Sequence, residues 1–193
     1  MDTPPARASS APLTPAQEAW SMVKPGAHFD AVKKFIPKSD IMAPRMDFFG
    51  KSDDAAMARI KDFLLQNPVV EAFDGKRVLL ANPQGKGDGL LRRAEHLAGR
   101  RRQSMGSGGR DFVIDKASMV PVIPETLRTG AIKVDHRGEH LYFKKYKDGL
   151  LHMVVVDPHG FLSDHGPVDA GVVTQYTPEA QKRFEGARVL VKN

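Results

Sequence analysis

The stretch AIKVDHRGEHLYFKKYKDGLLHMVVV, residues 131–156, predicts three consecutive strands of an antiparallel meander. Glycine-containing turns are expected at 135–138 and 147–149, between the strands. Residues 140–146 follow the period of two of a strand, and residues 150–156 are almost continuously apolar, which favours a central strand. One face of the middle strand is expected to carry His140, Tyr142, Lys144 and Tyr146, and the other face Leu141, Phe143 and Lys145.

The pattern extends this sheet in both directions along the chain. Two short apolar runs, 69–73 and 77–81, flank Asp74-Gly75, a strong hairpin signal. A polar loop over 82–89 precedes a helix expected from residue 90 to about 102, whose apolar face is Leu90, Leu91, Ala94, Leu97 and Ala98. After the meander we expect a loop over 158–167, a strand over 171–176 and a short helix opened by Thr177-Pro178. The fold class is therefore α+β, with helices packed on an antiparallel β-meander.

Three segments differ in composition. Residues 1–19 are rich in Pro, Ala, Ser and Thr and read as a disordered tail. Residues 20–67 predict a mostly helical accessory or linker segment, with a short helix near 30–36. Its second helix is capped by Ser52 or Asp53, ends at Asn67-Pro68 and has the apolar stripe Met57, Ile60, Phe63 and Leu64. Residues 68–193 form the main domain.

Composition excludes several classes of protein. The chain has no cysteine, which excludes disulfides and thiolate metal sites, and no apolar run of the roughly 18 residues that a membrane span needs. Its start lacks a signal-peptide pattern, so we expect a soluble protein that is cytoplasmic when made. The net charge is +6, and residues 92–110 contain six arginines against one acid, Glu95. Such a concentration of positive charge favours binding of a polyanion, most commonly nucleic acid. The alternative interpretation is that these arginines only form the solvent-exposed face of a helix.

A candidate site follows from the polar face of the helix over 90–102. Arg92, Arg93, His96 and Arg100 are spaced three and four apart, so their side chains converge. Nearby cations lower the pKa of a histidine and favour its neutral form, which suits His96 as a general base near pH 7. In the last strand, Tyr176 shares a face with Thr174 and can stack on a base. The alternative interpretation of Thr174 is that it has no functional role and is present because threonine favours β-strands.

Other signals fit their context poorly. The string His136-x-x-Glu139-His140 resembles a metalloprotease motif, but it lies at a turn between strands instead of on a helix. Gly85-x-Gly87-x-Gly89 lacks the dinucleotide spacing, although its amides could touch a phosphate. A metal site has the candidate ligands His152, His159, His165, Asp157 and Asp164, in no standard spacing, and His152 also fits a core histidine. We expect neither a metal nor a cofactor.

Five motifs, in order, carry a resemblance to a known family. They are Arg93-Ala94-Glu95-His96-Leu97, Ile123-Pro124-Glu125-Thr126-Leu127, Leu141-Tyr142-Phe143-Lys144-Lys145, Met153-Val154-Val155-Val156 and Val173-Thr174-Gln175-Tyr176. Over residues 69–185 the chain resembles the phage-associated branch of the barnase–EndoU–colicin–RelE-like (BECR) nuclease superfamily. Members of that superfamily are RNases, often toxins or cargo of phage virions and conjugative elements. The resemblance implies a barnase-like fold, with a short turn at the second motif.

It also implies an activity: metal-independent RNA cleavage, in which the 2′-OH attacks its own phosphate and leaves a 2′,3′-cyclic phosphate. In that reading His96 is the general base or acid, and the other catalytic residues are Arg92, Arg93, Lys144 and Thr174. Substrate binding is assigned to Arg100, Arg102, Tyr142, Tyr176 and His152. The partners implied are RNA and an acidic immunity or antitoxin protein, with delivery into a target cell or packaging in a virion.

One departure keeps an alternative open. Many members of the superfamily carry a second histidine shortly after the first, where this chain has Arg100-Arg101-Arg102 and a Gly/Ser loop. Either an arginine replaces that histidine, or a strand supplies the second proton carrier. The alternative function is a catalytically inactive nucleic-acid-binding or virion-associated structural protein of the same fold.

Overall fold

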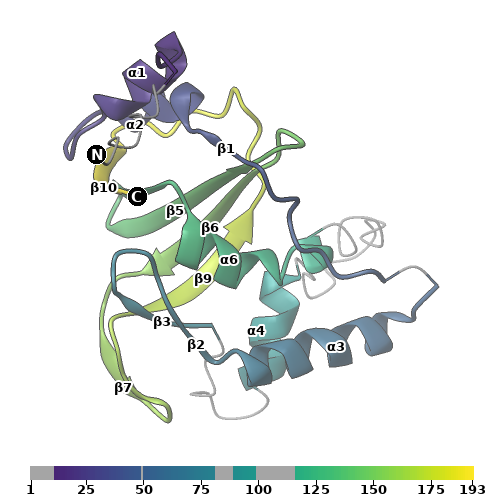
Figure 1. Cartoon of the computed structure of the whole chain (residues 1–193). Coiled ribbons are helices and arrows are strands. Elements are labelled where there is room, and N and C mark those ends of the chain that lie inside the picture. The colour runs from purple at the N-terminus through teal and green to yellow at the C-terminus, as the bar shows by residue number, and fades with distance from the viewer. Residues whose placement is uncertain (1–10, 49, 81–88, 99–115) are drawn as a thin grey trace, which may run out of the picture.

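The computed structural model of the chain describes residues 11–48, 50–80, 89–98 and 116–193, with the side chains of residues 89–92 excepted (Figure 1). It is an α+β protein built around one curled sheet, in which antiparallel pairings dominate. The strand order is β10-β4-β5-β6-β9-β3-β2, and a short β1 pairs with β5. These strands are β1 (Lys38–Ser39), β2 (Val69–Glu71), β3 (Arg77–Leu79), β4 (Ile132–His136), β5 (Glu139–Tyr146), β6 (Leu151–Asp157), β9 (Ala170–Tyr176) and β10 (Arg188–Lys192).

The predicted meander is confirmed as β4, β5 and β6, and β6 is central because β5 and β9 flank it. The alternation within β5 is confirmed as well. Tyr142 belongs to a core cluster on one face of the sheet, while Leu141 and Phe143 belong to a cluster on the other face. Both faces are therefore covered, so the polar positions of β5 are less exposed than a half-buried strand would leave them.

Helices α3 (Asp53–Gln66), α4 (Gly89–Leu97) and α6 (Val122–Thr129) cover the face that carries Tyr142. The α3 helix begins at the predicted cap, because the Ser52 side chain accepts a hydrogen bond from the backbone N–H of Ala55. Its buried residues are Ala56, Met57, Ile60 and Leu64. The start of α4 agrees with the prediction. Three other predicted features lie outside the described residues: the end of this helix near residue 102, the glycines at 85 and 87, and the Gly/Ser loop at 104–109.

The opposite face packs against the N-terminal segment, which contains α1 (Pro15–Ser21), α2 (Phe29–Val32) and the 3-10 helix η1 (Lys33–Phe35). Val23, Phe29 and Ile36 share a core cluster with the sheet residues Phe143 and Met153. Residues on both sides of the boundary predicted at residue 68 therefore share one hydrophobic core cluster. Helix α1 begins inside the disordered tail predicted over residues 1–19, because a capping box at Thr14 starts the helix at residue 15. Residues 1–10 are not among the described residues.

The hairpin predicted around Asp74-Gly75 is confirmed. Strands β2 and β3 pair antiparallel, and Gly75 has a φ of +78°, a backbone conformation that glycine adopts without strain. Next to it, β3 pairs parallel with β9, but only at Ala170 and Gly171 of that strand. The remainder of β9 consequently has no strand partner on this side among the described residues, and α4 contacts β9 there.

Three local predictions are wrong. The predicted loop over 158–167 contains a small hairpin of β7 (Phe161–Ser163) and β8 (Gly166–Val168). Instead of a helix after Thr177-Pro178, the chain turns and forms β10, whose alternating RVLVK sequence pairs with the exposed edge of β4. The turn implied at 123–127 is the helix α6; Pro124 is its third residue, where the missing N–H has no intrahelical partner to lose. None of the helices in the described part of the chain combines the length and the apolar character that a membrane span requires.

Candidate functional site

His96 lies near the end of α4, on an exposed surface beside two cations. Its neighbours Ala94, Leu97 and Ala98 are fully buried, so the helix presents the imidazole away from the core. Partial desolvation lowers the pKa of His96, and the charges of Lys116 and Arg93 lower it further. The imidazole is therefore neutral near pH 7, as predicted from the sequence, and able to accept a proton.

Arg93 ties α4 to the edge of β9. Its half-buried guanidinium donates a hydrogen bond to the carbonyl oxygen of Val173, at 3.0 Å. Val173 lies at a bulge: Val155 pairs with Thr174 and Val156 with Val172, which leaves Val173 as an extra residue in β9. Bulges of this kind locally interrupt a ladder and redirect side chains. Arg93 thus has a fixed position next to His96.

Lys116 was not predicted, and it is the second cation of the site. Its ammonium donates a hydrogen bond to Thr174 Oγ1 at 3.2 Å and lies 4.5 Å from the centroid of the Tyr176 ring. The ammonium of Lys182 lies 5.6 Å from the same ring. Tyr176 is 43% exposed, and the ring is therefore open to a ligand as well as to these cations.

We call Arg93, His96, Lys116, Thr174 and Tyr176 the β9-edge cluster. It combines a neutral imidazole, two cations, a hydroxyl and an exposed aromatic ring along one strand edge. Cations recognise phosphate oxygens, and an exposed ring stacks on a nucleobase. Thr174 is only 5% exposed, so its hydroxyl positions the ammonium of Lys116 and is not open to a phosphate, which corrects its predicted catalytic contact. An imidazole with a lowered pKa is suited to proton transfer. Three of the predicted catalytic residues (His96, Arg93 and Thr174) and one predicted binding residue (Tyr176) are brought together here.

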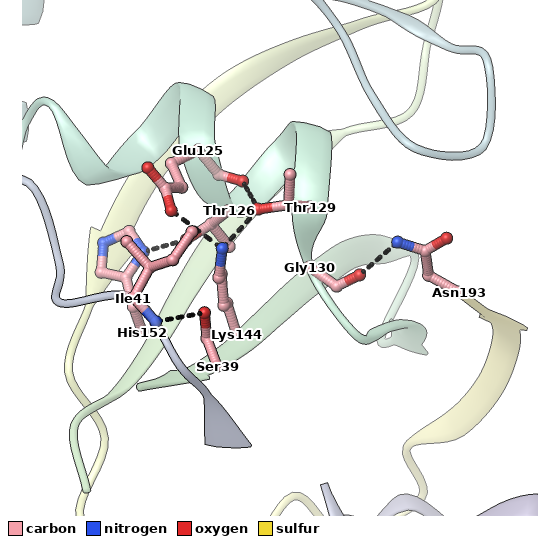
Figure 2. Close-up of polar contacts among 9 residues, drawn as sticks. All are labelled: Ser39, Ile41, Glu125, Thr126, Thr129, Gly130, Lys144, His152 and Asn193. Atoms are coloured by element: carbon pink, nitrogen blue, oxygen red, sulfur yellow. Dashed lines mark hydrogen bonds and ion pairs between the residues drawn. The ribbon is translucent and has the colours of Figure 1, made fainter. Parts of the chain in front are cut away.

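Lys144 is not part of this cluster, which corrects its predicted catalytic role. It is 5% exposed, and its ammonium donates to Glu125 Oε1 at 2.9 Å and to the hydroxyl of Thr129 (Figure 2). Both partners belong to α6. A phosphate could reach this ammonium only by displacing a carboxylate, so Lys144 anchors α6 to the sheet instead of binding a substrate.

Tyr142 and His152 are corrected for the same reason, because both are completely buried. The Tyr142 hydroxyl donates to Asp74 Oδ1 at 3.1 Å, and burial raises the pKa of this phenol. His152 hydrogen-bonds through Nδ1 to Thr126 Oγ1 at 2.8 Å (Figure 2) and through Nε2 to Gln175 Oε1 at 2.7 Å. Burial lowers the pKa of His152 to about 4. The reading of His152 as a core histidine is therefore the correct one.

Several predictions concern residues outside the description. The side chains of Arg92, Arg100 and Arg102 lie there, and their predicted contacts with a substrate stay predictions.

For the metal alternative, His159 and Asp157 form an exposed pair at 2.5 Å. Within the described ranges, no three histidine, aspartate or glutamate side chains come together as metal ligands.

Sequence reasoning missed two residues of this region, Lys116 and Gln175. Gln175 is fully buried on the helix-covered face of β9, with its amide nitrogen donating to the carbonyls of Leu97 and Lys116. The period of two within β9 would have placed Gln175 on the other face of the strand from Thr174 and Tyr176. No comparable signal marks Lys116, because its contacts with Thr174 and Tyr176 join residues that are far apart in the sequence.

Comparison with known proteins adds no identification. The chain matches no family model, no curated protein and no solved structure. The resemblance to the BECR superfamily therefore stays a prediction from the ordered motifs.

Proposed function

We propose that this chain is a metal-independent endoribonuclease whose active site is the β9-edge cluster. The observation that carries the proposal is the arrangement of His96. This exposed imidazole stands beside Arg93 and Lys116, and the ammonium of Lys116 contacts both the hydroxyl of Thr174 and the exposed ring of Tyr176. A proton acceptor, positive charge and a stacking surface are what cleavage of an RNA strand by its own 2′-OH requires.

In the proposed reaction His96 is the general base. Its neutral imidazole takes the proton of a 2′-OH, whose oxygen attacks the adjacent phosphorus while the bond from phosphorus to the 5′ oxygen breaks. The products are a 2′,3′-cyclic phosphate and a free 5′-OH. The lowered pKa of His96 keeps the imidazole unprotonated near pH 7, so the base is available before the substrate arrives.

The two cations act on the developing charge. Arg93, fixed by Val173, and Lys116, fixed by Thr174, offset negative charge on the phosphorane-like transition state. The ammonium of Lys116 also donates the proton that the departing 5′ oxygen needs. Afterwards the imidazolium of His96 releases its proton to water and the amine of Lys116 takes one up from water, which restores both groups. In this proposal Lys116 takes the place of the second histidine of the superfamily. Tyr176 holds the neighbouring base by stacking.

The fold and the biological setting belong to the same proposal. A barnase-like arrangement is supported by helices packed against an antiparallel-dominated sheet, and by the order of the five motifs along the chain. A net charge of +6 suits an RNA substrate and an acidic immunity or antitoxin protein as inhibitor. A toxin-like or phage-associated role, with delivery or packaging, rests on the resemblance alone.

The test is incubation of the purified protein with total RNA in EDTA, followed by analysis of the fragment ends. The wild-type protein should produce 2′,3′-cyclic phosphate ends, and His96→Ala should produce none. The matched control is His159→Ala, which removes an exposed histidine paired with Asp157 and should cleave like the wild type. Full activity of the His96→Ala protein would overturn the assignment.

A second candidate function is nucleic-acid binding without cleavage. The observation that favours it is that the β9-edge cluster contains a single histidine, while Arg93 and Lys116 both already have hydrogen-bond partners. A binding protein would retain RNA with a steep dependence on salt and leave it intact. Intact RNA after prolonged incubation with the wild-type protein, together with salt-sensitive binding, would select this candidate.

A further inference from the structure

A buried polar network lies directly behind the β9-edge cluster. Gln175 is fully buried, and its amide nitrogen donates to the carbonyl oxygens of Leu97 at 3.1 Å and Lys116 at 3.0 Å. Its Oε1 contacts His152 Nε2 at 2.7 Å, and His152 Nδ1 contacts the hydroxyl of Thr126 at 2.8 Å. The network therefore runs from α6 through β6 and β9 to α4 and residue 116.

The partners fix the direction of every hydrogen bond. Two carbonyls can only accept, so the amide nitrogen of Gln175 must face them and its oxygen must face His152. That oxygen needs a donor, which places the ring proton of His152 on Nε2. The bare Nδ1 then accepts from the Thr126 hydroxyl. Because every group is satisfied only in this arrangement, the network holds a single orientation.

Of the two carbonyls held by Gln175, one belongs to a member of the cluster, Lys116, and the other to Leu97, the neighbour of His96. Leu97 directly follows His96 in α4, and Lys116 carries the second ammonium of the site. Gln175 itself lies between Thr174 and Tyr176 in β9. One side chain thus connects the three stretches of chain that supply the cluster.

We infer that Gln175 is a positioning residue of the β9-edge cluster, held in its productive orientation by His152. It does not touch a substrate, since its side chain points to the helix-covered face of the sheet. It fixes how far the backbone of α4 and of residue 116 can move from β9, and therefore how close Lys116 stays to His96. The expected loss of cleavage rate rests on the proposed function. The expected release of residue 116 from β9 does not, and it can be measured without any substrate.

The experiment compares Gln175→Met, which keeps the volume and loses both donors, with Val154→Ala. Val154 is the register partner of Gln175, equally buried, and makes no bond to either carbonyl. The first readout is the titration of the His96 ring, followed by NMR in the absence of RNA. The charge of Lys116 depresses the pKa of His96, so release of residue 116 should raise that pKa in Gln175→Met and leave it unchanged in Val154→Ala.

The second readout is cleavage of a short RNA at equal concentrations of folded protein. Gln175→Met should lower kcat by at least about tenfold with little change in KM, because a misplaced catalytic group costs rate more than binding. Val154→Ala should retain kcat. If Gln175→Met does not fold, Gln175→Asn replaces it, since its shorter amide cannot span both carbonyls.

The outcomes separate the two proposals. A raised His96 pKa with no cleavage by any protein, the wild type included, supports the positioning role and overturns the proposed function. A His96 pKa and a kcat that are the same in Gln175→Met, Gln175→Asn and the wild type overturn the positioning role and leave the proposed function standing. Equal changes in Val154→Ala and Gln175→Met would also overturn it, because they would reduce Gln175 to general core packing.

Discussion

Lys116 contacts both faces of β9: its ammonium lies 3.2 Å from Thr174 Oγ1 on one face, and its carbonyl oxygen lies 3.0 Å from Gln175 Nε2 on the other. Thr174 pairs with Val155 and Gln175 with Val154, which belong to the core clusters on opposite sides of the sheet. A residue that spans a strand in this way needs an open edge. That edge exists because β3 leaves β9 after Gly171.

The position of Lys116 gives the first prediction. Lys116→Met should lower RNA cleavage by about two to three orders of magnitude, the usual loss when one charged stabiliser of a transition state is removed. It should also raise the pKa of His96, since the ammonium now depresses it. Lys182→Met is the control, because Lys182 is exposed and lies near Tyr176 at 5.6 Å without a bond to Thr174. An equal loss of cleavage in both variants would count against a specific role for Lys116.

Tyr176 gives a prediction about binding. Its ring should stack on an unpaired base, so Tyr176→Ala should weaken affinity for single-stranded RNA by about 1–3 kcal/mol, while Tyr176→Phe keeps the ring and most of the affinity. Fluorescence anisotropy at a fixed salt concentration measures both. Equal weakening by the two substitutions would mean that the hydroxyl, and not the ring, is recognised.

Much of this site's scaffold follows from the sequence, and much of its chemistry does not. The strands of the meander, the hairpin at Asp74-Gly75 and the α3 cap have local signals, namely a period of two, a turn dipeptide and a serine before an apolar stripe. The burial of Tyr142 and Lys144 has no local signal, because it depends on the helices that cover a face which alternation alone predicts to be half exposed. Lys116 has no local signal either, because its ammonium contacts Thr174 and Tyr176, which are far away in the sequence.

His152 gives a prediction about stability and pH. Its pKa is about 4 in the folded protein against an ordinary 6.5, so between these values the unfolded chain binds a proton that the folded chain does not. Stability from this group is complete above pH 6.5 and is lost as the pH falls towards 4, by roughly 3 kcal/mol in all. His152→Gln cannot titrate and should show a shallower loss over this range in urea unfolding. Identical pH slopes for the two proteins would contradict the assignment of a buried neutral imidazole.

A buried ion pair gives the fourth prediction. Lys133 Nζ lies 2.6 Å from Asp74 Oδ2, with side chains 6% and 7% exposed, and Asp74 also accepts from the Tyr142 hydroxyl. Asp74→Asn leaves the Lys133 charge uncompensated and should destabilise the fold by about 3–5 kcal/mol. The double variant Asp74→Asn/Lys133→Met removes both charges and should recover a large part of that loss.

The control for this pair is Asp157→Asn, which breaks the exposed pair with His159 and should change the unfolding free energy by less than about 1 kcal/mol. Urea denaturation measures all four proteins. A double variant no more stable than Asp74→Asn alone would show that the loss comes from packing or from the Tyr142 hydrogen bond, and not from the unpaired charge.

The role of His96 as the base that removes the proton of a 2′-OH is tested with a DNA oligonucleotide that contains a single ribonucleotide. The wild-type protein, in EDTA, is predicted to cut only on the 3′ side of that ribonucleotide and to leave a 2′,3′-cyclic phosphate, while His96→Ala leaves the strand intact. Cleavage at deoxynucleotides, or cleavage by His96→Ala at the wild-type rate, would show that His96 does not act as this base.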